Sequence, residues 1–227
     1  MTPRVLVLSG GVQPFVDPWH PFAAVSERVA AVARDAGLSV ELSTDPVRRL
    51  ADLTDVDVLV VNAPNPAMQG SADAVEGEPP SAAELAAAEA GLDALLQRRV
   101  GVLGVHVGAT ALLGFAAWPT VLGARWVPGV TWHPPLGPTV LRGAADPRVP
   151  GPRIEVVDER YTDLELAGDI TTLVDHEQDG RTHALVWARE VGPVRVVGDA
   201  LGHDPRSFDS AQHRELLARC LRWLARA

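Results

Sequence analysis

Lysine is absent from this chain of 227 residues, and all 20 of its basic residues are arginines. Without a side-chain amine no Schiff base can form, which excludes lysine-based aldolase chemistry and a pyridoxal phosphate (PLP) cofactor. A Walker-type phosphate loop also needs a lysine, so no nucleotide is expected as a cofactor. Mechanisms that depend on a reactive amine are therefore excluded.

Cysteine occurs once, as Cys220 in the C-terminal stretch HRELLARCLRWLARA. Apolar residues in this stretch recur at helical spacing, with Leu216, Leu217, Cys220, Leu221 and Leu224 on one side. The thiol is therefore expected to be a buried core group rather than a nucleophile. One cysteine cannot form an intramolecular disulfide, which fits a reducing compartment.

Long apolar runs and basic runs are also missing. No stretch approaches about 18 consecutive apolar residues, and the opening MTPRVLVLSGG has no secretory pattern. No basic run exceeds two residues and the net charge is −9, whereas binding nucleic acid needs clustered positive charge. We expect a cytoplasmic protein with no membrane and no nucleic-acid partner. A homo-oligomer remains open.

Apolar residues make up 47% of the chain, enough for the core of a single domain over residues 1–227. Strand and helix patterns alternate, which predicts an α/β fold with a doubly wound, mostly parallel sheet and helices on both faces. The expected strands are Val5–Ser9, Leu38–Ser43, Val56–Val61, a stretch ending at His106, Ile154–Val157, Ile170–Val174, Ala184–Ala188 and Val194–Val197. The expected helices are Pro21–Ala36, residues 82–98 and the C-terminal stretch.

Two segments stand apart from this alternation. Residues 63–80 form an acidic loop rich in proline and small residues, which is either mobile or a lid over the strand ends. Ser81 and Glu84 then form a capping box for the following helix. Residues 118–152 are rich in Trp, Gly and Pro and suit irregular loops and a hairpin.

The segment VGVLGVHVGATAL, residues 100–112, reads as a buried strand that ends at His106 and turns through Gly108 into a helix of small residues. Such a turn exposes the residue at its tip, where α/β enzymes often carry a nucleophile. A histidine there could instead cap the helix or bond a nearby carbonyl group.

Three residues are the main catalytic candidates: His106, His203 and Glu159. Each follows a predicted strand or lies in a loop near a strand end, where open α/β sheets bind ligands. Imidazole suits proton transfer near neutral pH, and two histidines with a carboxylate can also bind a divalent metal such as zinc. The alternatives are a turn residue for His203 and a structural ion pair for Glu159.

Further residues are candidates for binding a substrate, although each also has a structural explanation. Trp19 could stack on a sugar or pack in the core, Tyr161 could bond a hydroxyl or a buried partner, and Asp204 could orient an imidazole or cap a helix. The full set of substrate-binding candidates is His20, Trp19, Gly11, Asp158, Tyr161 and Asp204. His133 is a further candidate ligand, whereas His176, His183 and His213 read as surface or helix residues.

Several separated motifs resemble those of one family. They are HPF at 20–22, LGVHVGAT at 103–110, DERY at 158–161, VWAREVGPVRVVGDALGHDPRSF at 186–208 and the closing RWLA. In this order they are similar to the ThuA-like (trehalose utilisation) family over nearly the whole chain. The resemblance implies the class I glutamine amidotransferase-like, flavodoxin-like fold, and a carbohydrate ligand from the breakdown of trehalose or a related sugar.

The same resemblance argues against glutaminase activity. A glutaminase of this fold needs a cysteine at the strand tip and a glutamate two residues after the late histidine. Here the tip is His106, and Pro205 stands two residues after His203. A neutral imidazole does not replace the thiolate nucleophile of that mechanism.

Three functions remain open from the sequence. The favoured one is an enzyme that acts on a sugar, such as trehalose or a 3-keto sugar, by acid–base chemistry. The second is a non-catalytic sugar-binding or regulatory domain of the same fold, because one fold hosts many functions. The third is a metal-dependent hydrolase or lyase.

Overall fold

A nine-stranded sheet forms the centre of the computed structural model, which describes residues 2–12, 14–64 and 79–227. Its strand order is β2-β1-β3-β4-β11-β10-β9-β6-β7. The strands are β1 (Arg4–Ser9), β2 (Ser39–Ser43), β3 (Val58–Asn62), β4 (Gly101–Val105), β6 (Gly137–Gly143), β7 (Arg153–Asp158), β9 (Thr171–Gln178), β10 (Arg181–Val191) and β11 (Val194–Asp199). A separate short ribbon pairs β5 (Ala124–Arg125) with β8 (Glu165–Leu166).

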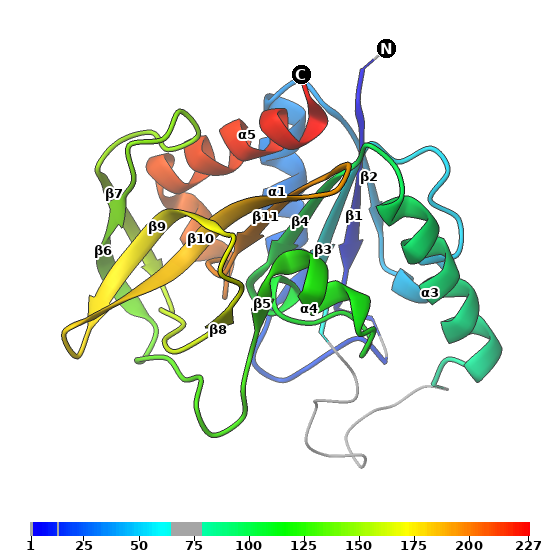
Figure 1. Cartoon of the computed structure of the whole chain (residues 1–227), viewed down its shortest axis with the longest axis horizontal. Helices are drawn as coiled ribbons and strands as arrows, with labels where there is room; N and C mark the ends of the chain where they lie inside the picture. Colours follow the sequence, from blue (N-terminus) through cyan, green and yellow to red (C-terminus); the bar gives the residue numbers. More distant parts are fainter. Residues whose placement is uncertain (1, 13, 65–78) are drawn as a thin grey trace.

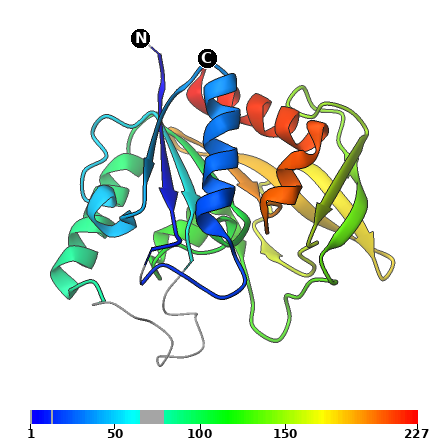
Figure 2. The same cartoon turned by 180° about the vertical axis from the view of Figure 1, so that it is seen from behind.

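Helices cover both faces of the sheet, as the sequence predicts (Figures 1 and 2). One face carries α1 (Phe22–Asp35) and α5 (Ala211–Ala225). The other face carries α2 (Pro46–Leu50), α3 (Ala82–Leu96) and α4 (Ala117–Leu122). Two 3-10 turns, η3 (His106–Ala109) and η4 (Pro205–Asp209), follow β4 and β11. The doubly wound α/β architecture is therefore confirmed.

Alternate residues of the central strands serve the two faces. In β3, Val58 and Val60 pack toward α1 and α5, whereas Leu59 and Val61 pack toward α2 and α3. Strands buried on both sides read as continuous apolar runs, which is why they are visible in the sequence. The capping box of Ser81 and Glu84 is present at the start of α3.

The sheet has a parallel half and an antiparallel half. Strands β2, β1, β3, β4 and β11 are parallel, and β10, β9, β6 and β7 continue the sheet antiparallel. The sequence predicts the late strands but not this change of direction. Only Asp179 and Gly180, both with positive φ, separate β9 from β10. Two residues suffice for a hairpin but not for a parallel crossover.

Strand direction brings the end of β7 to the same edge as the parallel strands. Three successive antiparallel pairings separate β11 from β6, and a fourth reverses direction again, so β7 runs parallel to β11. The antiparallel half also bends back across the sheet. The bend is evident from a contact between the two halves, in which Gly202, after β11, donates its N–H to Asp158 Oδ2, at the end of β7, at 2.7 Å. The carboxyl ends of β1, β4, β11 and β7 therefore meet.

Two local predictions need correction. The predicted helix after His106 is the single 3-10 turn η3, and the Gly108 carbonyl of this turn accepts the Trp118 indole N–H at 2.8 Å. The segment predicted to be irregular begins inside α4. The suggested lid at 63–80 lies largely outside the described residues.

The three histidines expected on the surface or on a helix are buried. His213 does lie on α5, but its side chain faces the core and contacts Asp199 Oδ2 at 2.9 Å. His176 and His183 face each other on β9 and β10. His176 bonds the Tyr161 carbonyl and His183 accepts the Asp163 N–H. Both side chains therefore satisfy backbone groups of the segment that packs against the β9–β10 hairpin. Cys220 is buried on α5, as predicted.

No helix in the described part of the chain is long and apolar enough to cross a membrane.

Candidate functional site

A cavity of about 740 Å³ lies where the loops after β1, β4, β7 and β11 meet. Its volume falls within the roughly 300–1,000 Å³ of small-molecule sites. Its polar wall consists of Asp17, His20, Thr110, His133, Glu159, Tyr161 and His203. Its apolar wall consists of Pro18, Trp19, Pro64, Val107, Ala111 and Trp126. Several of the residues singled out from the sequence therefore share one cavity.

His106 lies beneath the floor of this cavity and is only 1% exposed. Its backbone has a φ of +50°, a left-handed conformation that residues other than glycine rarely adopt. Its Nδ1 lies 2.9 Å from the Ala200 carbonyl oxygen, which can only accept, so Nδ1 carries the proton and Nε2 is left with a lone pair. Burial, together with His20 nearby, lowers the pKa of His106 well below 6.5, which keeps this imidazole neutral.

His20 approaches His106 from the loop between β1 and α1. Its Nε2 lies 3.2 Å from His106 Nε2, and its Nδ1 lies 2.7 Å from Asp17 Oδ2. The other oxygen of Asp17 accepts the backbone N–H groups of Trp19 and His20. Asp17 thus fixes both the loop and the imidazole, and burial is outweighed by these contacts, so the pKa of Asp17 is lowered.

His203 and Glu159 form an ion pair beside His106. His203 Nδ1 lies 3.3 Å from Glu159 Oε2 and 3.3 Å from His106 Nε2. Burial alone would lower the pKa of His203, but the hydrogen bond and charge of Glu159 outweigh it and raise the pKa above 6.5. Glu159 also lies 3.4 Å from His133 Nδ1 and 3.7 Å from His106 Nε2. One carboxylate therefore faces three imidazoles.

Tyr161 is a further residue that contacts His106. Its hydroxyl lies 3.0 Å from His106 Nε2, and its ring packs edge-on against Trp126 with ring centres 4.9 Å apart. Burial, followed by the charge of Glu159, raises the pKa of Tyr161 well above 10, so the hydroxyl remains a hydrogen-bond donor. The only tyrosine of the chain therefore lies in the polar cluster.

Asp158 supports the site without lining it. It is buried and accepts the N–H groups of Glu159, Gly202 and His203, which joins the loop after β7 to the loop after β11. Burial raises the pKa of Asp158 to about 6, although Ser207 and these backbone bonds favour the carboxylate. Asp158 is thus a positioning group for His203 and Glu159.

The remaining substrate-binding candidates have different places. Trp19 is 66% exposed at the cavity wall. Asp204 caps η4 and pairs with Arg206, which is the structural alternative considered for it. Gly11, with a φ of +104°, donates its N–H to the Phe15 carbonyl and is not among the residues that line the cavity. Of these three, Trp19 alone faces the cavity.

Sequence reasoning missed Asp17, Trp126 and Thr110. Asp17 has a detectable signal, because an Asp three residues before a His in a short loop can bond that loop and the imidazole together. Trp126 and Thr110 have no such signal, since only the fold brings them to the cavity.

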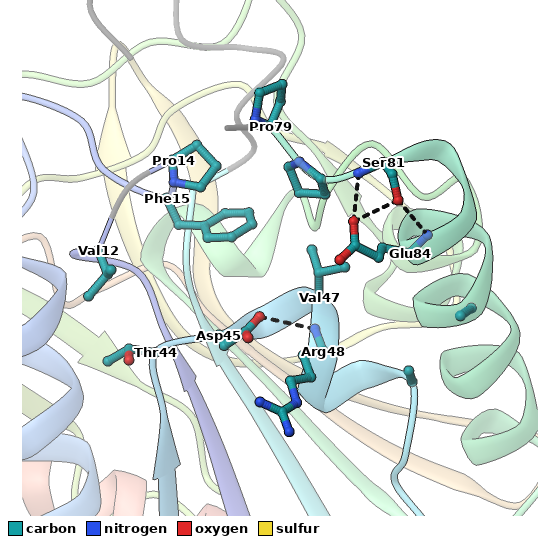
Figure 3. A pocket seen from close by; sticks show the side chains of 13 residues that line it. Val12, Pro14, Phe15, Thr44, Asp45, Val47, Arg48, Pro79, Ser81 and Glu84 are labelled. Atoms are coloured by element: carbon teal, nitrogen blue, oxygen red, sulfur yellow. Dashed lines mark hydrogen bonds between the residues drawn. The ribbon is translucent and has the colours of Figure 1, made fainter. Parts of the chain in front are cut away.

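A second cavity, of about 670 Å³, lies between α2 and α3 (Figure 3). Its charged groups already stabilise helix starts, because Asp45 accepts the Arg48 N–H, and Glu84 bonds Ser81. It contains no cluster of acid–base groups comparable to the His20–His106–His203 site among the described residues. The first cavity is therefore the candidate active site.

The fold and the strand-tip residue together define the class of this protein. It is an α/β protein of the glutamine amidotransferase-like type, with the imidazole of His106 directly after β4. More particularly, the chain belongs to the ThuA family, described as trehalose utilisation, whose model matches residues 4–224.

Solved structures support this fold. A protein described as ThuA-like from Parabacteroides merdae ATCC 43184 is 17% identical, with a TM-score of 0.75 over 99% of this chain and 90% of that one. A second, from Bacteroides uniformis ATCC 8492, is 14% identical, with a TM-score of 0.66 over 98% and 92%. A cytoplasmic protein of Salmonella typhimurium LT2 is 12% identical, with a TM-score of 0.63 over 97% and 99%. No curated protein matches the sequence.

Proposed function

We propose that the protein is an enzyme that acts on an uncharged sugar, of the trehalose or 3-keto sugar kind, with Glu159 and His203 as its acid–base pair. The observation that carries the proposal is the ion pair of these two residues on the wall of a cavity of about 740 Å³. The family description adds the link to trehalose utilisation.

The acid–base assignment follows from the environment, which shifts the pKa values of His203 and His106 in opposite directions. Against the effect of burial, Glu159 raises the pKa of His203 and favours its protonated form, whereas burial lowers the pKa of His106. Titratable neighbours with diverging pKa values are typical of acid–base sites. In this proposal His203 is the proton donor. Glu159 is the carboxylate that keeps this proton on His203 and returns it after the reaction. His106 does not line the cavity, so its proposed role is to hold His203 in place.

The walls of the cavity suit an uncharged carbohydrate. Trp19 and Trp126 offer flat apolar faces, and Glu159, His133 and Thr110 offer hydrogen-bonding groups. No arginine is among the described residues that line the cavity, and the chain has no lysine. A phosphorylated or carboxylated sugar would therefore find no arginine or lysine there, and the positive charge of His203 is already balanced by Glu159.

Calorimetry and product analysis with trehalose, its 3-keto form and a panel of monosaccharides test the proposal. Glu159→Gln and His203→Ala should lose turnover, and Trp19→Ala should weaken binding by roughly 0.5–1.5 kcal/mol. Trp132→Ala is the matched control, because Trp132 is also exposed but does not line the cavity. Binding without turnover by the native protein would favour a sugar-binding domain. No binding at millimolar concentration would contradict the sugar assignment.

A further inference from the structure

Three imidazole nitrogens from three separate loops converge on one point. They are Nε2 of His20 after β1, Nε2 of His106 after β4 and Nδ1 of His203 after β11. All three lie within 4.8 Å of one another. A cluster that draws on three loops far apart in the sequence is a product of the fold rather than of one local turn.

Each of these imidazoles has a second ring nitrogen. The hydrogen-bond partner of that second nitrogen determines whether the first one presents a proton or a lone pair to the shared point. Nδ1 of His106 faces a carbonyl oxygen and Nδ1 of His20 faces the Asp17 carboxylate, so both Nδ1 atoms are the donors. With both rings neutral, each Nε2 then carries a lone pair, and the two lone pairs face each other at 3.2 Å. That arrangement is repulsive without a proton or a metal ion between them, although the Tyr161 hydroxyl, 3.0 Å from His106 Nε2, can donate to that lone pair.

Two of the three separations between the nitrogens fit a metal ion directly, and the third, between His20 and His203, is within 4.8 Å. Histidine nitrogens bound to zinc lie at about 2.0–2.1 Å from the ion, which in a tetrahedral site puts neighbouring ligand atoms about 3.3–3.4 Å apart. The observed separations from His106 Nε2 are 3.2 Å to His20 and 3.3 Å to His203. Asp17 and the Ala200 carbonyl supply the outer hydrogen bonds that commonly orient metal-binding histidines.

We propose that His20, His106 and His203 bind one divalent transition-metal ion, with zinc as the favoured ion and a fourth position open toward Glu159 and the cavity. Imidazole ligands suit zinc and its neighbours in the transition series rather than magnesium or calcium. Three protein ligands with an open position are typical of catalytic zinc sites. This proposal goes beyond the proposed function, because it requires neither a sugar nor a reaction. Nδ1 of His203 cannot hold the acid proton and bind the ion at once, so stoichiometric metal binding would replace the acid role proposed for His203.

A shared proton is the competing explanation of the short contacts. His106 Nε2 can accept a hydrogen bond from the Tyr161 hydroxyl. If His203 or His20 carries an additional proton, one of their N–H groups can point at His106 Nε2 instead and relieve one contact. A metal ion relieves all the contacts among the three nitrogens at once. The two explanations differ in what the purified protein binds when a metal salt is the sole ligand.

The test uses the full chain, stripped with a chelator and titrated with zinc or cobalt salts. The native protein should bind one ion per chain, with the visible absorption of tetrahedral cobalt and a higher melting temperature. Asp17→Asn, which keeps every ligand, should weaken binding roughly 10–100-fold. His20→Ala should weaken it further, and His133→Ala, which removes a histidine from the same cavity, should bind as the native protein does.

Circular dichroism and melting curves show whether each variant folds. His106→Ala, which removes the central ligand, should also weaken binding. If this variant fails to fold, His20→Ala and Asp17→Asn decide, since both changes lie in the loop before α1. Absence of stoichiometric binding by the native protein would overturn the metal site. Equal binding by the native protein, His20→Ala and Asp17→Asn would also overturn it. Neither result depends on a sugar, so the proposed function is tested separately.

Discussion

At the scale of single residues, the backbone of His106 is the least expected feature of the site. A left-handed conformation costs an L-residue roughly 1–2 kcal/mol, and glycine would avoid that cost. His106 nevertheless has a φ of +50° and is buried below a cavity. Strain of this kind persists where the surrounding structure holds it, and it is concentrated at functional sites.

Two substitutions separate the backbone of His106 from its side chain. His106→Ala and His106→Gly both remove the imidazole, but only glycine relaxes the left-handed backbone. We expect His106→Gly to be more stable than His106→Ala by about 1 kcal/mol. Urea unfolding followed by circular dichroism measures the difference. Equal stability would mean that the turn relaxes to an ordinary conformation once the imidazole is gone.

His213 gives a pH prediction away from the cavity. Burial opposes its charge, but Asp199 and then Asp158 outweigh burial and raise the pKa of His213 above 6.5. The folded protein therefore holds this proton more tightly than the unfolded chain. The stabilisation is complete below about pH 6.5 and is lost as the pH rises through the folded pKa.

His213→Gln tests that sign. Below about pH 6.5 the substitution should cost about 3 kcal/mol or more, because it leaves Asp199 buried without its charged partner. The cost should shrink as the pH rises. Unfolding free energies of both proteins between pH 5 and pH 9 provide the measurement, and a cost that grows with pH would contradict the raised pKa.

At the scale of elements, the turn η3 is held against the neighbouring strand β3 by its glycine. A Cβ atom at Gly108 would overlap the backbone oxygen of Val61. Backbone cannot move aside as a flexible side chain does, so the turn itself must shift. Because His106 starts this turn, its imidazole would shift as well.

Gly108→Ala should therefore destabilise the protein by roughly 1–3 kcal/mol and weaken zinc binding, without changing any ligand. Gly168→Ala is the matched control, because a Cβ atom there meets nothing within 4 Å. Thermal melting and zinc titration of both variants make the comparison. A Gly108→Ala variant with native stability would show that η3 is looser than its packing indicates.

The elements differ in how much of them is visible in the sequence. β1, β3 and β4 are buried apolar runs, and α1 and α5 have apolar residues at helical spacing, so local pattern is enough. The shortness of the turn η3 is not visible in the sequence, because local pattern does not show contacts such as the one between the Trp118 indole and the Gly108 carbonyl. The antiparallel direction of β9 and β10 depends on a two-residue turn inside a long β pattern, which alternation alone does not reveal.

At the scale of the whole molecule, the site depends on topology. His106, Glu159 and His203 can be named from the sequence because each follows a predicted strand. Their meeting cannot be derived that way, since β7 lies at the far edge of the sheet from β4 and reaches the site through the bend of the antiparallel half. His20 likewise reaches the cluster only through the fold, because its loop is 86 residues away from His106 in the sequence.

Cys220 reports on the integrity of the whole fold. It is buried between α5 and the sheet, and burial raises the pKa of its thiol. A thiol reagent should therefore label the native protein very slowly and the urea-unfolded protein at once. The labelling rate in rising urea should follow global unfolding. Rapid labelling of the native protein would show that α5 detaches from the sheet without global unfolding.

The two ends of the chain lie on the side of the sheet away from the cavity. The chain enters the sheet at Arg4 and leaves α5 after Ala225, both at the edge where the parallel strands begin (Figure 1). Because no side chain carries a primary amine, an amine-directed reagent would leave every side chain that lines the cavity unmodified. Ligand binding could therefore be measured on amine-labelled protein without a change in the chemistry of the cavity.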